Sequence, residues 1–262
     1  MNKNELMRHM LMMRPDVEET KKKLNENPED SLGWYELGMA LSNAGDIESG
    51  LEAFSKAISL EPFNGYYYFG RGRKHNASGH FWSGISDLTM ATRIMPDNWT
   101  FWYYKATANN LEGKYEESAN DFKMCVKIAE PWECYPLVHW LYTTYLLDLN
   151  DKEKAQASLK LIPDDAVPPQ MDYGYSRCVK LYKGIIKPEE FVDKNMENDC
   201  LKQEGRVNLE LSTMYYGLYA YAIFIDDQKL ADEALKDLLK IGVPAAFGYK
   251  RGVVAAKQRG LI

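Results

Sequence analysis

The feature that most constrains the fold of this chain is a period of 34 residues in its first half. When the sequence is compared with itself at this offset, the same residue types return in seven columns. These columns are Pro28, Pro62 and Pro96; Gly45, Gly79 and Gly113; Gly38, Gly72 and Ala106; Trp34, Tyr68 and Trp102; Gly50, Gly84 and Ser118; Phe54, Leu88 and Phe122; and Ala57, Ala91 and Cys125. Agreement in this many places indicates one supersecondary unit that is used repeatedly.

Each unit is predicted to be a pair of helices. In the first unit Trp34, Leu37 and Leu41 recur at the three- and four-residue spacing of a buried helical stripe. A glycine provides the turn, a second amphipathic helix follows, and a proline ends it because proline cannot continue an α-helix. One pair of this size cannot bury its apolar face alone, so neighbouring pairs must stack against each other.

The spacing of seven residues in the first unit resembles that of the tetratricopeptide repeat. These residues are Trp34, Leu37, Gly38, Gly45, Phe54, Ala57 and Pro62. The resemblance is strong over residues 31–132, and it weakens afterwards because Thr143 or Tyr219 replaces the glycine of the first helix. It implies an all-α fold, a right-handed superhelix (α-solenoid) of stacked antiparallel helix pairs, in which the first helix of each pair lines a concave groove.

The resemblance divides the chain into four parts. Residues 1–30 are expected to form N-terminal capping helices, a Met-rich one and a second that begins near Pro15, and residues 31–132 three well-formed repeats. Residues 133–244 are expected to form degenerate helix pairs, and residues 245–262 a C-terminal capping helix, because a terminal unit faces water on one side. The degenerate pairs are expected at about residues 136–162, 171–201 and 212–241.

A proline-rich segment interrupts the degenerate pairs. Pro163, Pro168 and Pro169 stand within residues 163–169, and three prolines this close together prevent a helix from continuing. The segment is predicted to be a joint, either a longer turn between repeats or a hinge between subdomains.

Side chains that would carry catalysis or hold a metal or cofactor are not grouped in the sequence. The four histidines, His9, His75, His80 and His139, are scattered. The glycines and arginines of residues 70–74 lie inside a predicted helix and lack the third glycine of a dinucleotide-binding loop. Two pairs of adjacent aspartates, at 164–165 and 226–227, lie at predicted turns, where aspartate is favoured for local hydrogen bonding. We therefore expect no enzyme, no cofactor and no metal site.

The charge balance and the apolar runs limit the partners and the location. The 32 basic and 38 acidic side chains give a net charge of -6, which opposes binding to nucleic acid. No apolar run approaches the roughly 20 residues of a membrane helix. Arg8, His9 and Arg14 interrupt the apolar start, so no signal peptide is indicated and a cytoplasmic protein without membrane contact is expected. The basic end, residues 238–262, is expected to complement the dipole of the last helix.

The groove implied by the resemblance is predicted to bind a peptide. Offsets 0, 3, 7 and 10 of each first helix share one side. Aromatic rings there would bury side chains of an extended peptide, amides would bond its backbone, and Arg73 would bind a carboxylate. The alternative is that the tyrosines only pack across neighbouring helices. The predicted peptide- or protein-binding residues are Tyr35, Met39, Tyr66, Phe69, Arg73, Asn76, Tyr103, Thr107, Asn110 and Trp140.

The sequence therefore predicts a non-catalytic scaffold or adaptor for protein–protein interaction, whose partner is another protein or a peptide. Three alternatives stay open. The chain would otherwise be a peptide-sensing regulator that changes conformation, a subunit of a larger assembly, or an enzyme with its catalytic residues within 133–262. The pattern leaves the oligomeric state open.

Overall fold

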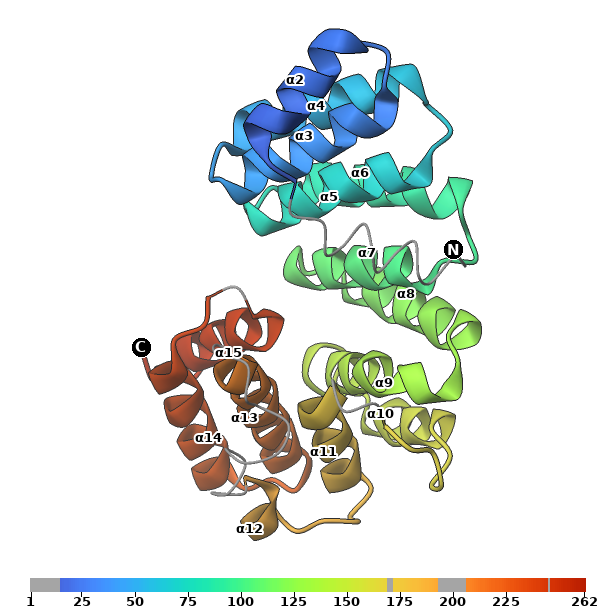
Figure 1. The fold of residues 1–262 in the computed structure, drawn as a ribbon. Coiled ribbons are helices and arrows are strands. Elements are labelled where there is room, and N and C mark those ends of the chain that lie inside the picture. The colour runs from blue at the N-terminus through green and yellow to red at the C-terminus, as the bar shows by residue number, and fades with distance from the viewer. Residues whose placement is uncertain (1–14, 169–171, 193–205, 245) are drawn as a thin grey trace. The chain divides into compact units, whose positions relative to one another are not determined.

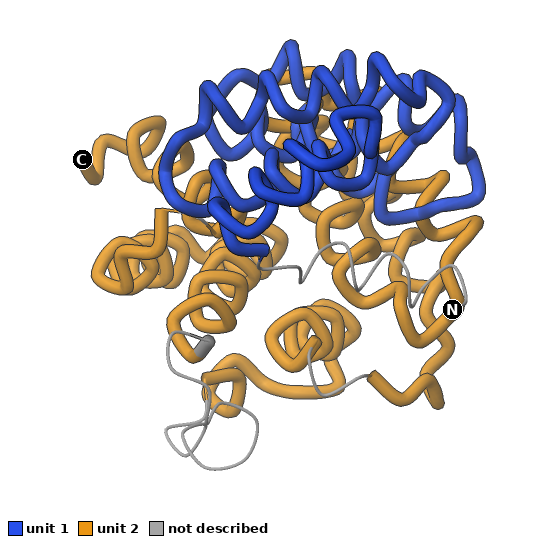
Figure 2. Tube along the Cα trace, turned by 45° about the horizontal axis from the view of Figure 1, so that its top comes forward, with its two compact units in different colours: residues 1–108 blue, residues 109–262 orange. Residues whose placement is uncertain are grey.

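The computed structural model describes residues 15–168, 172–192, 206–244 and 246–262, and within these ranges it contains helices and no strand (Figure 1). The prediction of an all-α fold made of antiparallel helix pairs is confirmed. The chain divides into two compact units, residues 1–108 and 109–262, which are coloured separately in Figure 2. Each unit is described by itself below.

Unit 1 is a series of helical hairpins. Helix α3 packs along α4, and α5 packs along α6 in the same way. The turns within these two hairpins contain Gly45 and Gly79, whose φ angles of 97° and 79° lie in the left-handed region that glycine adopts without strain. The helices are α2 (Val17–Glu26), α3 (Ser31–Asn43), α4 (Ile47–Leu60), α5 (Gly65–Ala77), α6 (Phe81–Ile94) and α7 (Trp99–Leu111), the last of which contains the boundary between the units.

Glycines let the two helices of each hairpin come close together. A Cβ at Gly38 would lie 2.9 Å from the ring of Phe54 and 3.0 Å from the carbonyl oxygen of Gly50. In the next hairpin a Cβ at Gly72 would lie 3.2 Å from the carbonyl oxygen of Gly84. Large side chains therefore fill the space beside each crossing, and Phe54 is fully buried there.

The tryptophan and proline columns of the repeat are linked by a hydrogen bond. The indole Nε1 of Trp34 donates to the carbonyl oxygen of Pro28 at 2.8 Å, and that of Trp102 donates to Pro96 at 2.8 Å. Because both bonds span six residues, the indole fixes the entry of the chain into its first helix. This contact explains why both columns recur at the same period.

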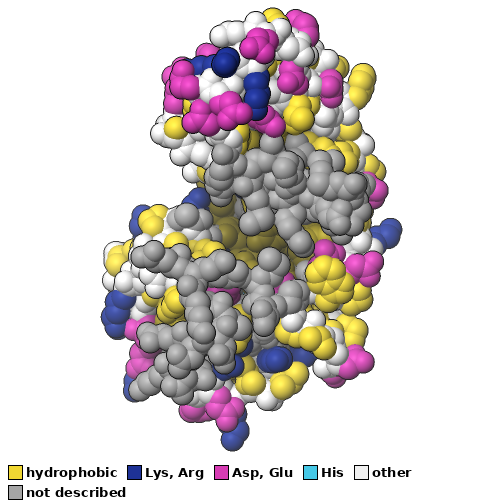
Figure 3. Space-filling view, in the orientation of Figure 1, with side chains coloured by type: hydrophobic (Ala, Val, Ile, Leu, Met, Phe, Trp, Pro, Cys, Tyr) yellow, Lys and Arg dark blue, Asp and Glu magenta, His cyan; other side chains and the backbone are white. Residues whose placement is uncertain are grey.

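At the N-terminal end, the side chain of Asp16 caps α2 by accepting from the backbone N–H of Glu19 at 2.8 Å. The predicted Met-rich helix before it lies outside the described residues. On the face shown in Figure 3, acidic and basic side chains are interspersed over α2. Two of its lysines form ion pairs within the helix, Lys21 with Glu18 and Lys23 with Glu19.

Unit 2 begins with the continuation of the repeats. Its helices are α8 (Tyr115–Ile128), the 3-10 turn η1 (Pro131–Glu133), α9 (Cys134–Thr143), the π-helical turn η2 (Thr144–Asp148), α10 (Lys152–Ser158), the 3-10 turn η3 (Leu159–Leu161), α11 (Tyr173–Tyr182), α12 (Pro188–Phe191), α13 (Arg206–Phe224), α14 (Gln228–Ile241) and α15 (Phe247–Gln258). The pair expected at 136–162 corresponds to α9 through η3. The helix expected from residue 212 begins six residues earlier, and residues 193–201 of the expected 171–201 pair lie outside the described residues.

The period changes at η2. The left-handed turn residues Gly45, Gly79 and Gly113 are 34 positions apart, whereas the next one, Asn150 with φ 51°, follows Gly113 by 37 positions. At this longer offset the core columns of the second helix return as Ala155, Leu159 and Ile162, which are 0%, 4% and 2% exposed. The repeat therefore continues past residue 132 with three additional residues between its turns, one before α9 and two within α9 and η2, which is why its columns fade at the fixed offset of 34.

Hydrogen bonds hold the described part of the proline-rich segment. The hydroxyl of Tyr135 donates to the carbonyl oxygen of Ala166 at 2.6 Å. The ammonium group of Lys183 donates to the carbonyl oxygen of Ile162 at 2.7 Å and to the carboxylate of Asp164 at 2.6 Å. The segment up to residue 168 is thus tied to α9 and to the residue that follows α11.

The close crossing in the first hairpin gives a prediction about stability. Replacing Gly38 by Val should lower the free energy of unfolding by about 1–3 kcal/mol, because the new side chain overlaps the ring of Phe54 and the backbone of Gly50. Ser59→Val, at an exposed position of α4, should change it by less than about 0.5 kcal/mol. Urea titration followed by circular dichroism measures both, and equal stability of the two variants would contradict the tight crossing.

Candidate functional site

The structure places the predicted binding residues in both units. Asn110 and Trp140 belong to unit 2. The other eight belong to unit 1: Tyr35 and Met39 on α3; Tyr66, Phe69, Arg73 and Asn76 on α5; and Tyr103 and Thr107 on α7. The two groups are therefore considered separately.

Several of the unit 1 residues are part of its core. Tyr35, Met39 and Phe69 are 0%, 2% and 1% exposed and belong to one hydrophobic cluster. The ring of Tyr35 meets Phe54 edge-on at 5.3 Å, and that of Phe69 stacks on Phe101 at 4.7 Å. These side chains pack across neighbouring helices, as the alternative interpretation of the sequence allowed. Their contact with a peptide stays a prediction.

Arg73 is different because its guanidinium is held beside a pair of aromatic rings that also contact each other. Its Cζ lies 5.5 Å from the ring centre of Phe69 and 5.2 Å from that of Tyr104. Its Nη1 is buried and has no hydrogen-bond partner among the described residues. The neighbouring Arg71 is fully used in comparison, since its Nε and Nη2 donate to both carboxylate oxygens of Asp87 at 2.8 and 2.7 Å. Arg73 thus keeps hydrogen-bonding capacity that Arg71 does not.

Other polar atoms of the same helix faces are buried and without a partner in the described ranges. They are the hydroxyls of Tyr35 and Tyr66 and the Oδ1 of Asn76. Burial raises the pKa of Tyr35 to about 12, and the charge of Arg73 acts in the opposite direction on this hydroxyl. We call Tyr35, Tyr66, Phe69, Arg73, Asn76 and Tyr104 the Arg73 face. It holds a buried N–H of Arg73 and two buried tyrosine hydroxyls beside aromatic rings, while the Oδ1 of Asn76 lies against Gly84 of α6.

Helix α7 contributes Tyr104, which the sequence did not single out. The backbone carbonyl of Tyr104 accepts from Asn76 Nδ2 at 3.3 Å and from Thr107 Oγ1 at 2.9 Å. The predicted Tyr103 is half-buried and meets the ring of Tyr104 at 5.5 Å. The equivalent positions of the two preceding repeats hold Glu36 and Gly70, so the repeat predicts no particular residue type there. The aromatic run that begins at Trp99 was the only sequence signal for Tyr104.

In unit 2, Asn110 belongs to a buried polar network. Its Nδ2 donates to Thr144 Oγ1 at 3.1 Å and to Asp148 Oδ2 at 3.0 Å. Asp148 also forms an ion pair with Arg251 of α15, and the two side chains are 7% and 9% exposed. Arg251 is therefore an interior residue paired with Asp148, which corrects the interpretation of all the basic residues at 238–262 as partners of the helix dipole.

Trp140 lies among other rings in unit 2. Its ring centre is 4.3 Å from that of Phe247 and 5.7 Å from that of Tyr216. The adjacent His139 is 0% exposed, and its Nδ1 lies 3.1 Å from the hydroxyl of Tyr182. Burial lowers the pKa of His139 to about 3, so its imidazole is neutral at pH 7. The described part of this cluster is a core, and a role of Trp140 in binding stays a prediction.

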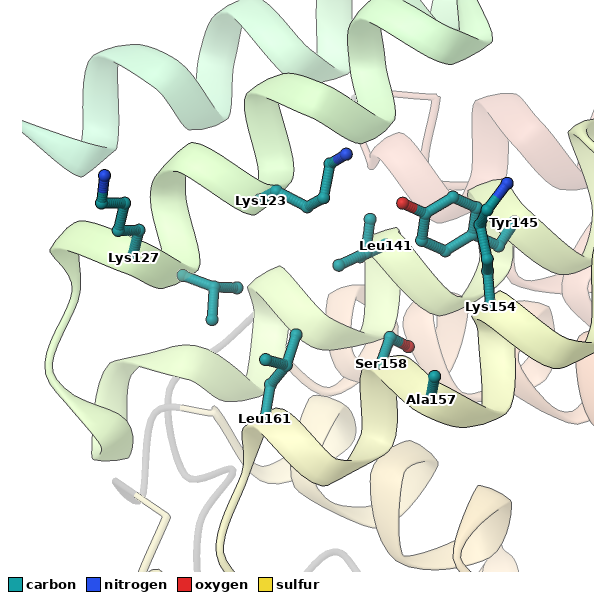
Figure 4. Close-up of a pocket in the computed structure, with 9 residues that line it drawn as sticks. Lys123, Lys127, Leu141, Tyr145, Lys154, Ala157, Ser158 and Leu161 are labelled. Atoms are coloured by element: carbon teal, nitrogen blue, oxygen red, sulfur yellow. The ribbon is translucent and has the colours of Figure 1, made fainter.

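A second surface in unit 2 was not predicted from the sequence. Between α8 and the α9–α10 pair lies an open depression of about 410 Å³ (Figure 4). We call it the lysine trough because three lysines stand among its apolar side chains. Its lining residues are Lys123, Val126, Lys127, Leu141, Tyr145, Lys154, Ala157, Ser158 and Leu161.

The described residues contain neither a candidate metal cluster nor a candidate membrane span. No three His, Cys, Asp or Glu side chains among them are grouped so that they could hold a metal ion. Within the same ranges no helix has the length and apolar character needed to cross a membrane.

Comparison with known proteins identifies the repeat. Residues 33–64 match the family model described as tetratricopeptide repeat. The chain therefore contains a tetratricopeptide repeat, as the resemblance of its sequence predicted. No curated protein sequence matches the chain.

Solved structures share the fold of this chain at low sequence identity. YrrB, a TPR protein with an unusual peptide-binding site, is 14% identical, with 91% of this chain and 97% of YrrB covered and a TM-score of 0.51. PilW, a type IV pilus biogenesis factor, is 11% identical, with 84% and 82% covered and a TM-score of 0.53. MamA from Desulfovibrio magneticus RS-1 is 17% identical, with 55% and 80% covered and a TM-score of 0.50. At these identities the likeness shows the fold alone.

The buried His139 makes stability depend on pH. Its pKa is about 3 in the folded chain and about 6.5 in an unfolded one, so its contribution is fully present above pH 6.5 and decreases as the pH falls towards 3. Lowering the pH from 7 to 5 should therefore reduce the free energy of unfolding by about 2 kcal/mol, because the buried imidazole of His139 stays neutral while an unfolded one becomes protonated.

Urea titrations at the two pH values test this effect. His139→Phe should lose that part of the pH dependence, whereas His80→Phe, at an exposed histidine, should keep it. An unchanged pH dependence in His139→Phe would mean that this imidazole is not held neutral by the fold.

Proposed function

We propose that this tetratricopeptide repeat protein is a non-catalytic scaffold that holds an extended segment of a partner protein on the Arg73 face. In this proposal the guanidinium of Arg73 binds a carboxylate of that segment. The observation that carries the proposal is the buried Nη1 of Arg73, which lacks a partner among the described residues while the guanidinium lies beside two rings.

The energetics of Arg73 favour an anionic ligand. A buried donor without an acceptor costs about 1–3 kcal/mol, and a ligand that supplies the acceptor recovers this cost. The rings of Phe69 and Tyr104 restrict the guanidinium before binding, so little conformational entropy is lost when the ligand arrives. A carboxylate is the best match, because guanidinium and carboxylate form two parallel hydrogen bonds.

A neighbouring hydroxyl suits the backbone of an extended peptide. Tyr66 lies on the same side of α5 as Arg73, because the two residues are separated by seven positions. Its hydroxyl can donate to a peptide carbonyl. That YrrB is a TPR protein with a peptide-binding site agrees with such a use of the fold.

The partner class, the location and the absence of catalysis that the sequence predicts are part of the proposed function. The partner is another protein or a peptide and not nucleic acid, in keeping with the net charge of -6. A cytoplasmic location and the absence of catalysis belong to the same proposal.

The test is a binding measurement with defined peptides. An array of fluorescein-labelled decapeptides, with acidic side chains or a free C-terminal carboxylate, is screened against the full chain, and the best peptide is titrated by fluorescence anisotropy. Arg73→Gln should raise its dissociation constant about tenfold or more, because a charge-assisted bidentate contact is lost.

Arg93→Gln is the matched control, because Arg93 is an exposed arginine of α6. It should leave the dissociation constant unchanged. If Arg73→Gln binds the peptide as tightly as the unchanged chain, or if no acidic peptide binds, the Arg73 face is not the binding site.

A further inference from the structure

We propose that the lysine trough is a second, independent binding site, which takes an acidic amphipathic peptide segment of a partner protein. Such a segment would place one bulky apolar side chain in the trough and its carboxylates against the lysines. The site lies wholly in unit 2, on α8, on α9 with η2, and on α10 with η3 (Figure 4).

The trough has an apolar floor. Leu141 and Tyr145, which are 1% and 7% exposed, lie at its base, and Val126 is half-buried beside them. At one end Leu161 is 43% exposed, which is unusual for a leucine whose neighbours form a core. The volume of about 410 Å³ lies within the range of roughly 300–1,000 Å³ that is typical of ligand sites. A leucine or phenylalanine side chain would lose its contact with water there.

The charges around the floor are not balanced within the described part of the chain. Lys154 pairs with Asp151 at 2.8 Å and lies 5.8 Å from the ring centre of Tyr145. Glu116 also acts on Lys154, so this lysine is already compensated. Lys123 and Lys127 are exposed and have no ion pair with another described residue. Two free positive charges thus stand together on a chain whose net charge is -6.

The spacing of these two lysines suits a peptide. Lys123 and Lys127 are one helical turn apart on α8, so their stems leave the helix about 6 Å from each other. Carboxylates three or four positions apart on an amphipathic helix, or two apart on an extended chain, have a similar separation. The acidic groups would pair with these lysines while the apolar residue between them enters the trough.

The openness of the trough argues against a small lipid-like acid. Ala157 and Leu161 are exposed along the α10 side, so the depression does not enclose an acyl chain. A peptide does not need enclosure, because its backbone keeps its contact with water while one side chain is buried. Charge complementarity therefore points to an acidic peptide segment as the occupant.

The experiment uses blocked peptides and a charge reversal. Acetylated and amidated dodecapeptides carry two Glu residues four positions apart with a Leu or Phe between them, and binding to the full chain is followed by fluorescence anisotropy. Lys123→Glu with Lys127→Glu should weaken binding about tenfold or more. Leu161→Asp should weaken it as well, because the apolar end of the trough becomes charged.

The matched control is Lys236→Glu with Lys240→Glu. These lysines occupy the same two positions of α14, another helix of 14 residues, as Lys123 and Lys127 occupy in α8. Charge change and helix position are therefore equal, and the control differs in its place and in the ion pair that Lys240 forms with Asp237. The control and Arg73→Gln should bind the dodecapeptide normally, which separates this site from the Arg73 face.

Three results would overturn the proposal. The first is that the unchanged chain binds none of the dodecapeptides. The second is that the variant at Lys123 and Lys127 binds them as tightly as its control does. Alternatively, sedimentation would show that the unchanged chain self-associates and that this variant alone is monomeric, in which case a second copy of the chain occupies the trough. Circular dichroism establishes beforehand that every variant keeps its helical fold.

Discussion

The close crossing of paired helices at glycines is the constraint on which the rest of unit 1 depends. Gly38 and Gly72 leave no room for a Cβ, because the carbonyl oxygens of Gly50 and Gly84 lie so near. The backbones therefore touch, and the large side chains of the core pack beside the contact instead of within it. Helix α5, which carries Arg73 and the ring of Phe69 beside it, is consequently held close against α6.

Much of unit 1 was predictable because its information is local. The glycine and proline columns fix where helices turn and end, and the indole of Trp34 bonds a carbonyl only six residues away. The side of α5 that carries Phe69, Arg73 and Asn76 also follows from helical periodicity alone. Tyr104 did not follow, since its column holds a different kind of residue in each repeat.

Unit 2 was less predictable because its decisive contacts join distant residues. Asp148 and Arg251 are 103 positions apart, and nothing in either local sequence indicates the other. The lysine trough likewise requires α8 and α10 to line one depression, and the three additional residues between Gly113 and Asn150 obscured this at the fixed offset of 34. An ion pair that is almost fully buried needs excellent geometry to offset desolvation, so both partners must be supplied together.

Because the period changes between Gly113 and Asn150, the two halves of the chain differ in how they can be rebuilt. Within unit 1 each hairpin closes through its own glycines, so a segment of 34 residues could be copied or removed as a cassette with its contacts intact. A cassette cut through Thr144–Asp148 would carry a buried carboxylate away from its arginine. The first half of the chain is therefore modular, whereas the second half has to be inherited, transplanted and folded as one piece.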